Sequence, residues 1–145
     1  MLLTLAVLVT LGIVGVYGYT SLFREAASPR DLTDQFDEAG VTCTRYDLLG
    51  DFRDSKSLWC ATDDGKAITV NTYTAGMTTE EYLVGKCGAF APDSPRGSLV
   101  VDDTWVVDVQ QVATTPPTTK RVAEDIAIVL GGTVTPYDCA RVKRG

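Results

Sequence analysis

The first 23 residues carry no charged side chain, and this limits how much of the chain is available to fold as a water-soluble domain. Residues 2–16 are almost wholly apolar and lack the polar face that a helix in the core of a small domain would show. About 20 helical residues span the roughly 30 Å hydrocarbon core of a bilayer. Tyr17 and Tyr19 would then lie near one membrane interface, where amphipathic rings are favoured. We therefore predict a transmembrane anchor, or a signal segment, over residues 1–23.

The anchor and the cleaved signal differ in the flanks of the apolar run. A secretory signal usually has a basic start, a shorter apolar stretch and a cleavage site of small residues. Here no Lys or Arg precedes the run, the run is long, and residues 16–18 and 26–28 are only weak cleavage sites. An uncleaved, single-pass anchor in the cell membrane is therefore the prediction, with secretion after cleavage as the alternative.

Four cysteines follow the apolar segment, at Cys43, Cys60, Cys87 and Cys139. An even number in a small domain behind a membrane signal is typical of disulfides, with free buried thiols as the alternative. A zinc site needs closely spaced Cys or His residues, whereas the chain has no His and its cysteines are widely spaced. We predict the pairs Cys43–Cys60, on consecutive strands, and Cys87–Cys139, which would join a helix to the last strand.

The orientation of the predicted anchor rests on two opposing signals. Arg24 and Arg30 follow the anchor and no basic residue precedes it, which favours a cytoplasmic domain. The cysteines favour an oxidising compartment. Because two arginines are a weak bias, we predict that the domain lies on the extracytoplasmic side.

The rest of the chain alternates between helical and strand patterns. Ser28-Pro29 and the pair Thr78 and Glu81 are typical helix starts, and Gly40 is a typical helix end. The hairpin around Asp64-Gly65 allows two registers, and the one that sets Cys60 opposite Ile68 is favoured because it places the cysteine on an apolar face. The predicted order is helix 28–40, strand 41–46, strands 57–62 and 66–73, helix 78–88, strands 98–101 and 105–109, a helix ending at 130, and an edge strand 133–135.

These elements predict one α+β domain over residues 24–139, followed by a basic tail over residues 140–145. Its sheet would be mostly antiparallel, with five or six strands packed by about three helices and held by two disulfides. A chain of 145 residues is long enough for one such domain and too short for two.

Catalytic and cofactor motifs are not found in the sequence. Without His there is no Ser–His or Cys–His nucleophile, and no glycine-rich phosphate loop occurs. The acid pairs Asp63-Asp64 and Asp102-Asp103 fall where hairpin turns are expected, and Asp is favoured in turns. The net charge of −6 disfavours binding to nucleic acid. We expect no catalytic residue, no metal, no cofactor and no enzyme activity.

Five elements follow one another along the chain. They are a helix ending in Gly, a strand with Cys, a Cys strand running into a D-G hairpin, an aromatic hairpin and a helix closed by Gly-Gly: Gly40, Cys43, Cys60, Asp64-Gly65, Trp105 and Gly131-Gly132. This plan resembles the small secreted or membrane-anchored domains of actinobacteria. The resemblance covers roughly residues 28–139 and implies an exported domain, but it assigns a role to no residue.

These observations lead to two hypotheses for function. The first is a non-enzymatic extracytoplasmic module that binds another protein or a component of the cell envelope. The second is an accessory subunit of a membrane protein complex, docked through its transmembrane helix. For the first, the candidate contact surface is the loop over residues 89–97, where Phe90 offers an apolar anchor and Arg96 a planar cation. The alternative for Phe90 is that it folds back onto the core.

Overall fold

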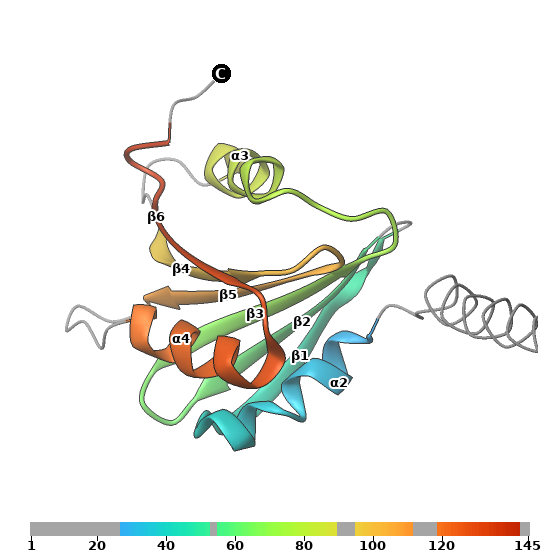
Figure 1. Ribbon diagram of the computed structural model, residues 1–145, viewed down its shortest axis with the longest axis vertical. Helices are drawn as coiled ribbons and strands as arrows, with labels where there is room; N and C mark the ends of the chain where they lie inside the picture. The colour runs from blue at the N-terminus through green and yellow to red at the C-terminus, as the bar shows by residue number, and fades with distance from the viewer. Residues whose placement is uncertain (1–26, 53–54, 90–94, 112–118, 143–145) are drawn as a thin grey trace, which may run out of the picture.

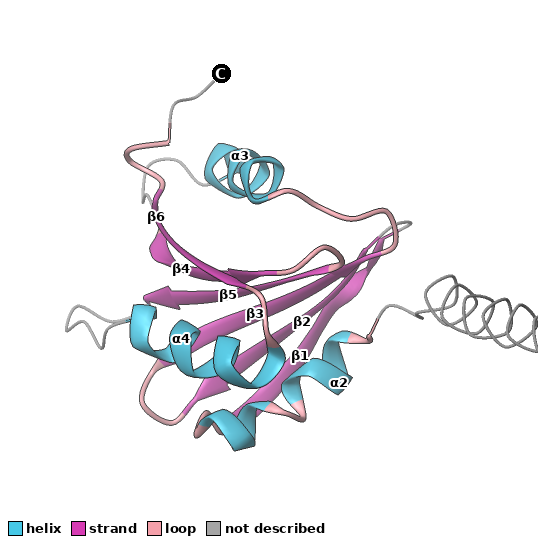
Figure 2. Ribbon diagram, in the orientation of Figure 1, coloured by secondary structure: helices cyan, strands magenta, loops and turns pink. Residues whose placement is uncertain are grey.

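The computed structural model describes residues 27–52, 55–89, 95–111 and 119–142. A six-stranded antiparallel sheet runs through the molecule in the order β1-β2-β3-β5-β4-β6. One helix covers one face of the sheet, and the remaining helices cover the other face (Figure 1, Figure 2). The elements are α2 (Pro29–Thr33), η1 (Phe36–Ala39), β1 (Cys43–Phe52), β2 (Ser55–Thr62), β3 (Lys66–Tyr73), α3 (Thr79–Ala89), β4 (Arg96–Val101), β5 (Trp105–Gln111), α4 (Thr119–Leu130) and β6 (Thr133–Asp138).

The predicted fold class is confirmed for the domain. The order of helices and strands, the antiparallel sheet and both disulfides are those expected from the sequence. The predicted anchor at residues 1–23, by contrast, lies outside the described residues. Within the described ranges, no helix is long and apolar enough to cross a membrane.

The sheet separates two apolar cores because successive strand residues point to opposite faces. In β5, Val107 and Val109 face the helices α2 and α4, whereas Val106 faces α3. The larger core also buries Phe36 from η1 and Ile126 from α4. The smaller core lies beneath α3 and is built around the chain's second disulfide, with the members Cys87, Leu99, Val106, Tyr137 and Cys139.

The first helix is shorter than predicted. The sequence indicated one helix over residues 28–40, but α2 ends at Thr33 and a 3₁₀ turn follows as η1. The Thr33 hydroxyl donates to the Arg30 carbonyl (2.9 Å), and the Gln35 amide donates to the Asp31 carbonyl (3.0 Å). The Arg30 carbonyl still accepts its helical bond from the Asp34 N–H (2.9 Å). The Gln35 side chain, by contrast, takes the Asp31 carbonyl that its own backbone N–H would bind in an α-helix, and that N–H donates to the Leu32 carbonyl instead (3.2 Å). The predicted start at Ser28 and end at Gly40 are confirmed.

The first strand is longer than predicted, and the hairpin after it has the expected register. The sequence predicted a strand over residues 41–46, whereas β1 begins at Cys43 and continues to Phe52, with register shifts on either side of its centre. In the next hairpin, Cys60 lies opposite Ile68 and Leu58 opposite Val70. This is the three-residue turn, and it requires a left-handed residue that Gly65 supplies at φ 81°.

Both predicted disulfides form. Cys43 and Cys60 join the neighbouring strands β1 and β2, with Cα atoms 5.6 Å apart. Cys87 and Cys139 join α3 to the chain just after β6, with Cα atoms 5.2 Å apart. In the chain-entropy description, closing loops of these lengths stabilises the fold by about 3 and about 4 kcal/mol respectively.

Gly131 and Gly132 end α4 and turn the chain into β6, both with positive φ angles of 83° and 91°. Their surroundings differ. A Cβ atom on Gly132 would lie 2.8 Å from the Val101 carbonyl oxygen and 3.1 Å from the Trp105 ring, whereas one on Gly131 would meet nothing within 4 Å. The turn therefore tolerates a side chain only at the first position.

We expect Gly131→Ala to lower the free energy of unfolding by about 1 kcal/mol, because it adds left-handed strain alone. Gly132→Ala should lower it by about 3 kcal/mol, because the added methyl also forces β4 away from the turn. Urea unfolding of the two variants measures the difference. Equal losses would contradict the close approach of the turn to β4.

Candidate functional site

Two hollows lie on opposite sides of the described structure. One, of about 240 Å³, lies between the β2–β3 turn and α4. The other, of about 380 Å³, lies between α3 and the sheet. Both are near or within the size range of small ligand pockets, so their chemistry decides between them.

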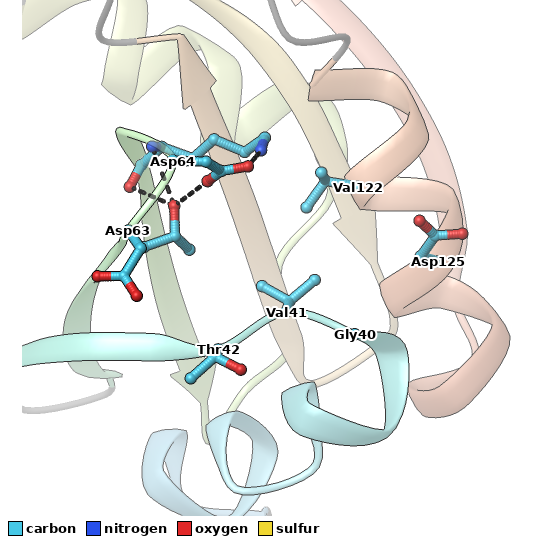
Figure 3. Close-up of a pocket in the computed structure, with 9 residues that line it drawn as sticks. Gly40, Val41, Thr42, Asp63, Asp64, Val122 and Asp125 are labelled. Atoms are coloured by element: carbon cyan, nitrogen blue, oxygen red, sulfur yellow. Dashed lines mark hydrogen bonds and ion pairs between the residues drawn. The ribbon is translucent and has the colours of Figure 1, made fainter.

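The smaller hollow is acidic and its main polar groups bind one another. Figure 3 shows Val122 and Asp125 on α4, across the hollow from Asp63 and Asp64 in the turn. Asp64 forms an ion pair with Lys66 and accepts a hydrogen bond from Thr62 (2.6 Å). Burial lowers the pKa of Lys66. The acid pair therefore lies in a hairpin turn, as predicted for residues 63–64. In the described part of the chain, no three Asp, Glu, His or Cys side chains gather into a metal-binding group.

The larger hollow, here called the α3 groove, is mostly apolar and open along one side of α3. Its floor comes from the central strands and β1, and its wall comes from one side of α3 and the segment before it. Glu81, at its rim, accepts hydrogen bonds from the Thr78 backbone N–H (3.0 Å) and hydroxyl (2.7 Å), which lower the Glu81 pKa. The lining residues are Leu49, Thr69, Tyr73, Met77, Glu81, Tyr82, Gly85, Lys86 and Gln110.

Two lining residues of this groove, Tyr82 and Lys86, bind a buried carboxylate. Asp108 in β5 is fully buried. Its Oδ1 accepts a hydrogen bond from the Tyr137 hydroxyl (2.9 Å), and its Oδ2 accepts one from the Tyr82 hydroxyl (3.0 Å). Lys86 forms an ion pair with the same oxygen. We call these four residues, Asp108, Lys86, Tyr82 and Tyr137, the Asp108 cluster.

The cluster continues across the sheet through neutral groups. The Asn71 amide donates to the Tyr82 hydroxyl (3.3 Å), and the Ser57 hydroxyl donates to the Asn71 carbonyl oxygen (2.6 Å). Ser57 and Asn71 lie opposite each other in the β2–β3 register. Among the described residues, every buried side-chain nitrogen or oxygen has a hydrogen-bond partner. The network is therefore complete without a ligand.

Burial and the Asp108 charge together keep the tyrosines protonated. Burial, and then the negative charge of Asp108, raise the pKa of Tyr82 and of Tyr137 well above that of a free phenol. The same two causes raise the pKa of Tyr73 to about 12. Phenols that stay neutral donate hydrogen bonds to the carboxylate and do not act as bases near neutral pH.

The chemistry of the Asp108 cluster is therefore that of a clamp. Tyr82 and Lys86, one turn apart on α3, both bind Asp108, and Cys87 is disulfide-bonded next to them. This clamp holds α3 over the smaller core. It positions one wall of the α3 groove without supplying a reactive group to it.

Of the two residues predicted to bind a partner, Phe90 falls outside the described residues. Arg96 is the first residue of β4 rather than part of a loop, and its Nε lies 3.2 Å from Asp138 Oδ2 across the β4–β6 pair. Arg96 does not line the α3 groove, and its guanidinium group, which was expected to bind a partner's anion, is paired with a carboxylate of this chain.

Sequence reasoning missed the Asp108 cluster. One signal was present, because Asp108 is the lone acid within the apolar run of β5. A buried strand position with a carboxylate implies a buried partner. The partners themselves are 22 to 29 residues away in the sequence, so the pattern did not indicate which residues they were.

The chain matches no protein-family model, no curated protein and no solved structure. No function is therefore inferred from similarity, and the α3 groove and its clamp carry the functional conclusion.

We expect Asp108→Asn to lower the free energy of unfolding by about 3 to 5 kcal/mol, because it leaves the Lys86 ammonium buried without a counter-charge. Adding Lys86→Met to Asp108→Asn should recover about 1 kcal/mol or more, since both charges are then absent. Asp138→Asn, at the more exposed ion pair with Arg96, is the matched control and should cost about 1 kcal/mol or less. Urea unfolding of the wild type and the three variants measures these values. A double variant that is less stable than Asp108→Asn alone would contradict the clamp.

The raised tyrosine pKa values also predict alkaline unfolding. Above pH 10 the unfolded chain releases phenol protons that the folded chain retains, so stability is complete below that pH and falls as pH rises. Tyr82 and Tyr137 should each lower the free energy of unfolding by about 1.4 kcal/mol per pH unit, with a smaller part from the less buried Tyr73. Ultraviolet absorbance of tyrosinate during a pH titration should rise together with loss of the fold. Ionisation of these groups in a protein that stays folded would contradict the prediction.

Proposed function

We propose that this protein is a non-enzymatic, membrane-anchored binding module on the extracytoplasmic side, which holds an apolar segment of a partner protein in the α3 groove. The observation that carries the proposal is a largely apolar groove of about 380 Å³ whose wall is fixed by a disulfide and a buried ion pair. A preformed groove lowers the ordering cost of binding.

The groove favours binding over catalysis for a chemical reason. Lys86 and Asp108 neutralise each other, and the tyrosine hydroxyls around Asp108 have raised pKa values. Among the described lining residues, this leaves no activated nucleophile or base facing the hollow. What it offers a ligand is apolar surface with a small number of polar groups at its edge.

The charge of the groove supports a partner with a basic residue beside its apolar anchor. The ammonium of Lys86 is committed to Asp108, so the exposed carboxylate of Glu81 is the groove's uncompensated charge. The whole chain carries a net charge of −6, which attracts basic partners over a longer range.

Two observations support the extracytoplasmic location. Two disulfides in one small domain are typical of an oxidising compartment. The uncharged apolar segment at residues 1–23 would tether the domain to the membrane, so that the groove works next to the membrane surface.

The groove is tested most sharply by filling it from α3 itself. Gly85 lines the groove, and a Cβ atom there would meet nothing within 4 Å. We expect Gly85→Leu to abolish partner capture while leaving the melting temperature unchanged or higher, because Leu is a better helix former than Gly. Capture is measured in intact cells with a membrane-impermeant cross-linker, followed by purification of the full chain.

Gly88→Leu is the matched control, since Gly88 lies on the same helix, is also open, and does not line the groove. It should capture the partner as the wild type does. Equal capture by both variants would overturn the groove as the binding site. Cross-linking that succeeds only after lysis would overturn the extracytoplasmic location.

A further inference from the structure

The strand β1 forms one edge of the sheet, and its outer side has no strand partner among the described residues (Figure 1). Residues 44–50 are all exposed. Leu48 is 81% exposed and Tyr46 is 38% exposed, an unusual exposure for large apolar side chains. An exposed apolar edge strand is a template for pairing with another strand.

Two irregularities in β1 restrict the strands with which this edge can pair. Register shifts interrupt the strand between Cys43 and Arg45 and again between Leu48 and Gly50. Such irregularities limit edge-to-edge pairing. The regular part of the edge is therefore the stretch Arg45, Tyr46, Asp47 and Leu48, in which a cation and an anion flank one aromatic ring.

This stretch is complementary to itself. We propose that two copies of this chain pair antiparallel through their β1 edges, in the register that centres on Tyr46. Each Arg45 then lies opposite Asp47 of the other copy, and the two Tyr46 rings meet at the two-fold axis. Such isologous pairing is the commonest form of protein dimer.

Charge singles out this register from its neighbours. Centring the pair on Asp47 sets two carboxylates opposite each other, and centring it on Arg45 sets two guanidinium groups opposite each other. Like charges directly opposite are destabilising in antiparallel pairs, whereas opposite charges stabilise them. The charges of Arg45 and Asp47 disfavour pairing with unrelated strands and favour pairing with a second copy of the same strand.

The exposed apolar side chains gain cover in this arrangement. Tyr46 lies opposite Cys60 and Leu48 opposite Leu58 in the β1–β2 register, so both point to the same face of the sheet. Across the dimer, each Leu48 would lie diagonal to the other copy's Tyr46, within reach of an aromatic ring. The Arg30 guanidinium, 4.2 Å from the centre of the Tyr46 ring, holds that ring in place.

The proposed interface is short. Leu49 of the same strand lines the α3 groove, but neither Arg45 nor Asp47, whose charges select the register, contributes to that lining. We expect a weak, concentration-dependent and salt-sensitive dimer. The dimer and the proposed binding function are tested with different variants, so a failure of the dimer proposal leaves the proposed function untouched.

The test is sedimentation equilibrium of the full chain in neutral detergent micelles over a range of protein concentrations. Wild type should show a monomer–dimer equilibrium. Arg45→Asp and Asp47→Arg should each raise the dimer dissociation constant at least about tenfold, because each sets like charges opposite one another. An equimolar mixture of the two single variants should restore dimers, since the carboxylates of one chain then face the guanidinium groups of the other.

Arg121→Asp, a charge reversal at an exposed position of α4, is the matched control and should dimerise as the wild type does. A wild type that stays monomeric throughout would overturn the proposal. So would dimers that persist unchanged in both single variants, which would place the contact elsewhere, including the apolar segment. A mixture that fails to restore dimers would overturn the register.

Discussion

The buried ion pair between Asp108 and Lys86 is the constraint on which the arrangement of α3 depends. Asp108 lies in β5, between β3 and β4 in the sheet, where an unpaired carboxylate would be very costly. Two tyrosine hydroxyls, one ammonium and, more weakly, the Gln110 amide (3.5 Å) donate to it, and two of these four donors come from α3. The helix therefore has one position over the sheet that leaves no buried charge unpaired. Because α3 carries a weak apolar stripe, directional polar contacts replace much of the packing that usually holds a helix on a sheet.

Different interactions hold the helices on the two faces of the sheet. On one face, α4 presents Ala123 and Ile126 to a continuous apolar core, and apolar packing holds it there together with one hydrogen bond between the Thr119 and Ser98 hydroxyls (3.3 Å). On the other face, a smaller core is supplemented by the Cys87–Cys139 disulfide and the Asp108 cluster. A small core leaves more of its sheet face uncovered, and the α3 groove lies along that uncovered part. The limited packing beneath α3 and the groove beside it therefore have the same cause, which is the small size of this core.

The β1 edge is subject to a separate constraint. A small sheet with six strands has two edges, and β6 is protected by Pro136, which cannot donate a ladder hydrogen bond. β1 has no proline, and its protection consists of its charges and two register shifts. An unrelated strand does not place complementary charges opposite those of β1, so the charges disfavour its pairing. A second copy of β1 does place complementary charges there, so the same charges favour pairing between two copies. Edge protection and self-recognition are then compatible in one strand.

Most of the secondary structure depends on interactions within a few residues, so it could be predicted from the sequence. The capping pairs Ser28–Asp31 and Thr78–Glu81, the left-handed Gly65 and the end of α4 at Gly131 each depend on neighbours no more than four residues away. The disulfide pairs followed from the strand order along the chain. The split of the first helix was missed because side-chain bonds to backbone carbonyls are not visible in an apolar pattern.

The packing of the whole chain determines that β5 pairs with β3 and β4 with β6, and it also forms the Asp108 cluster and the α3 groove. The contacts of Asp108 join residues 22 to 29 positions apart, and the β3–β5 and β4–β6 pairs join residues still farther apart in the sequence. Periodicity does not specify which strands are neighbours. The sequence marked Asp108 as a carboxylate in an apolar strand, but it did not indicate that Lys86, Tyr82 and Tyr137 would converge on it. Periodicity tells which face of an element is buried, whereas the partner that it meets there depends on how all the elements pack together.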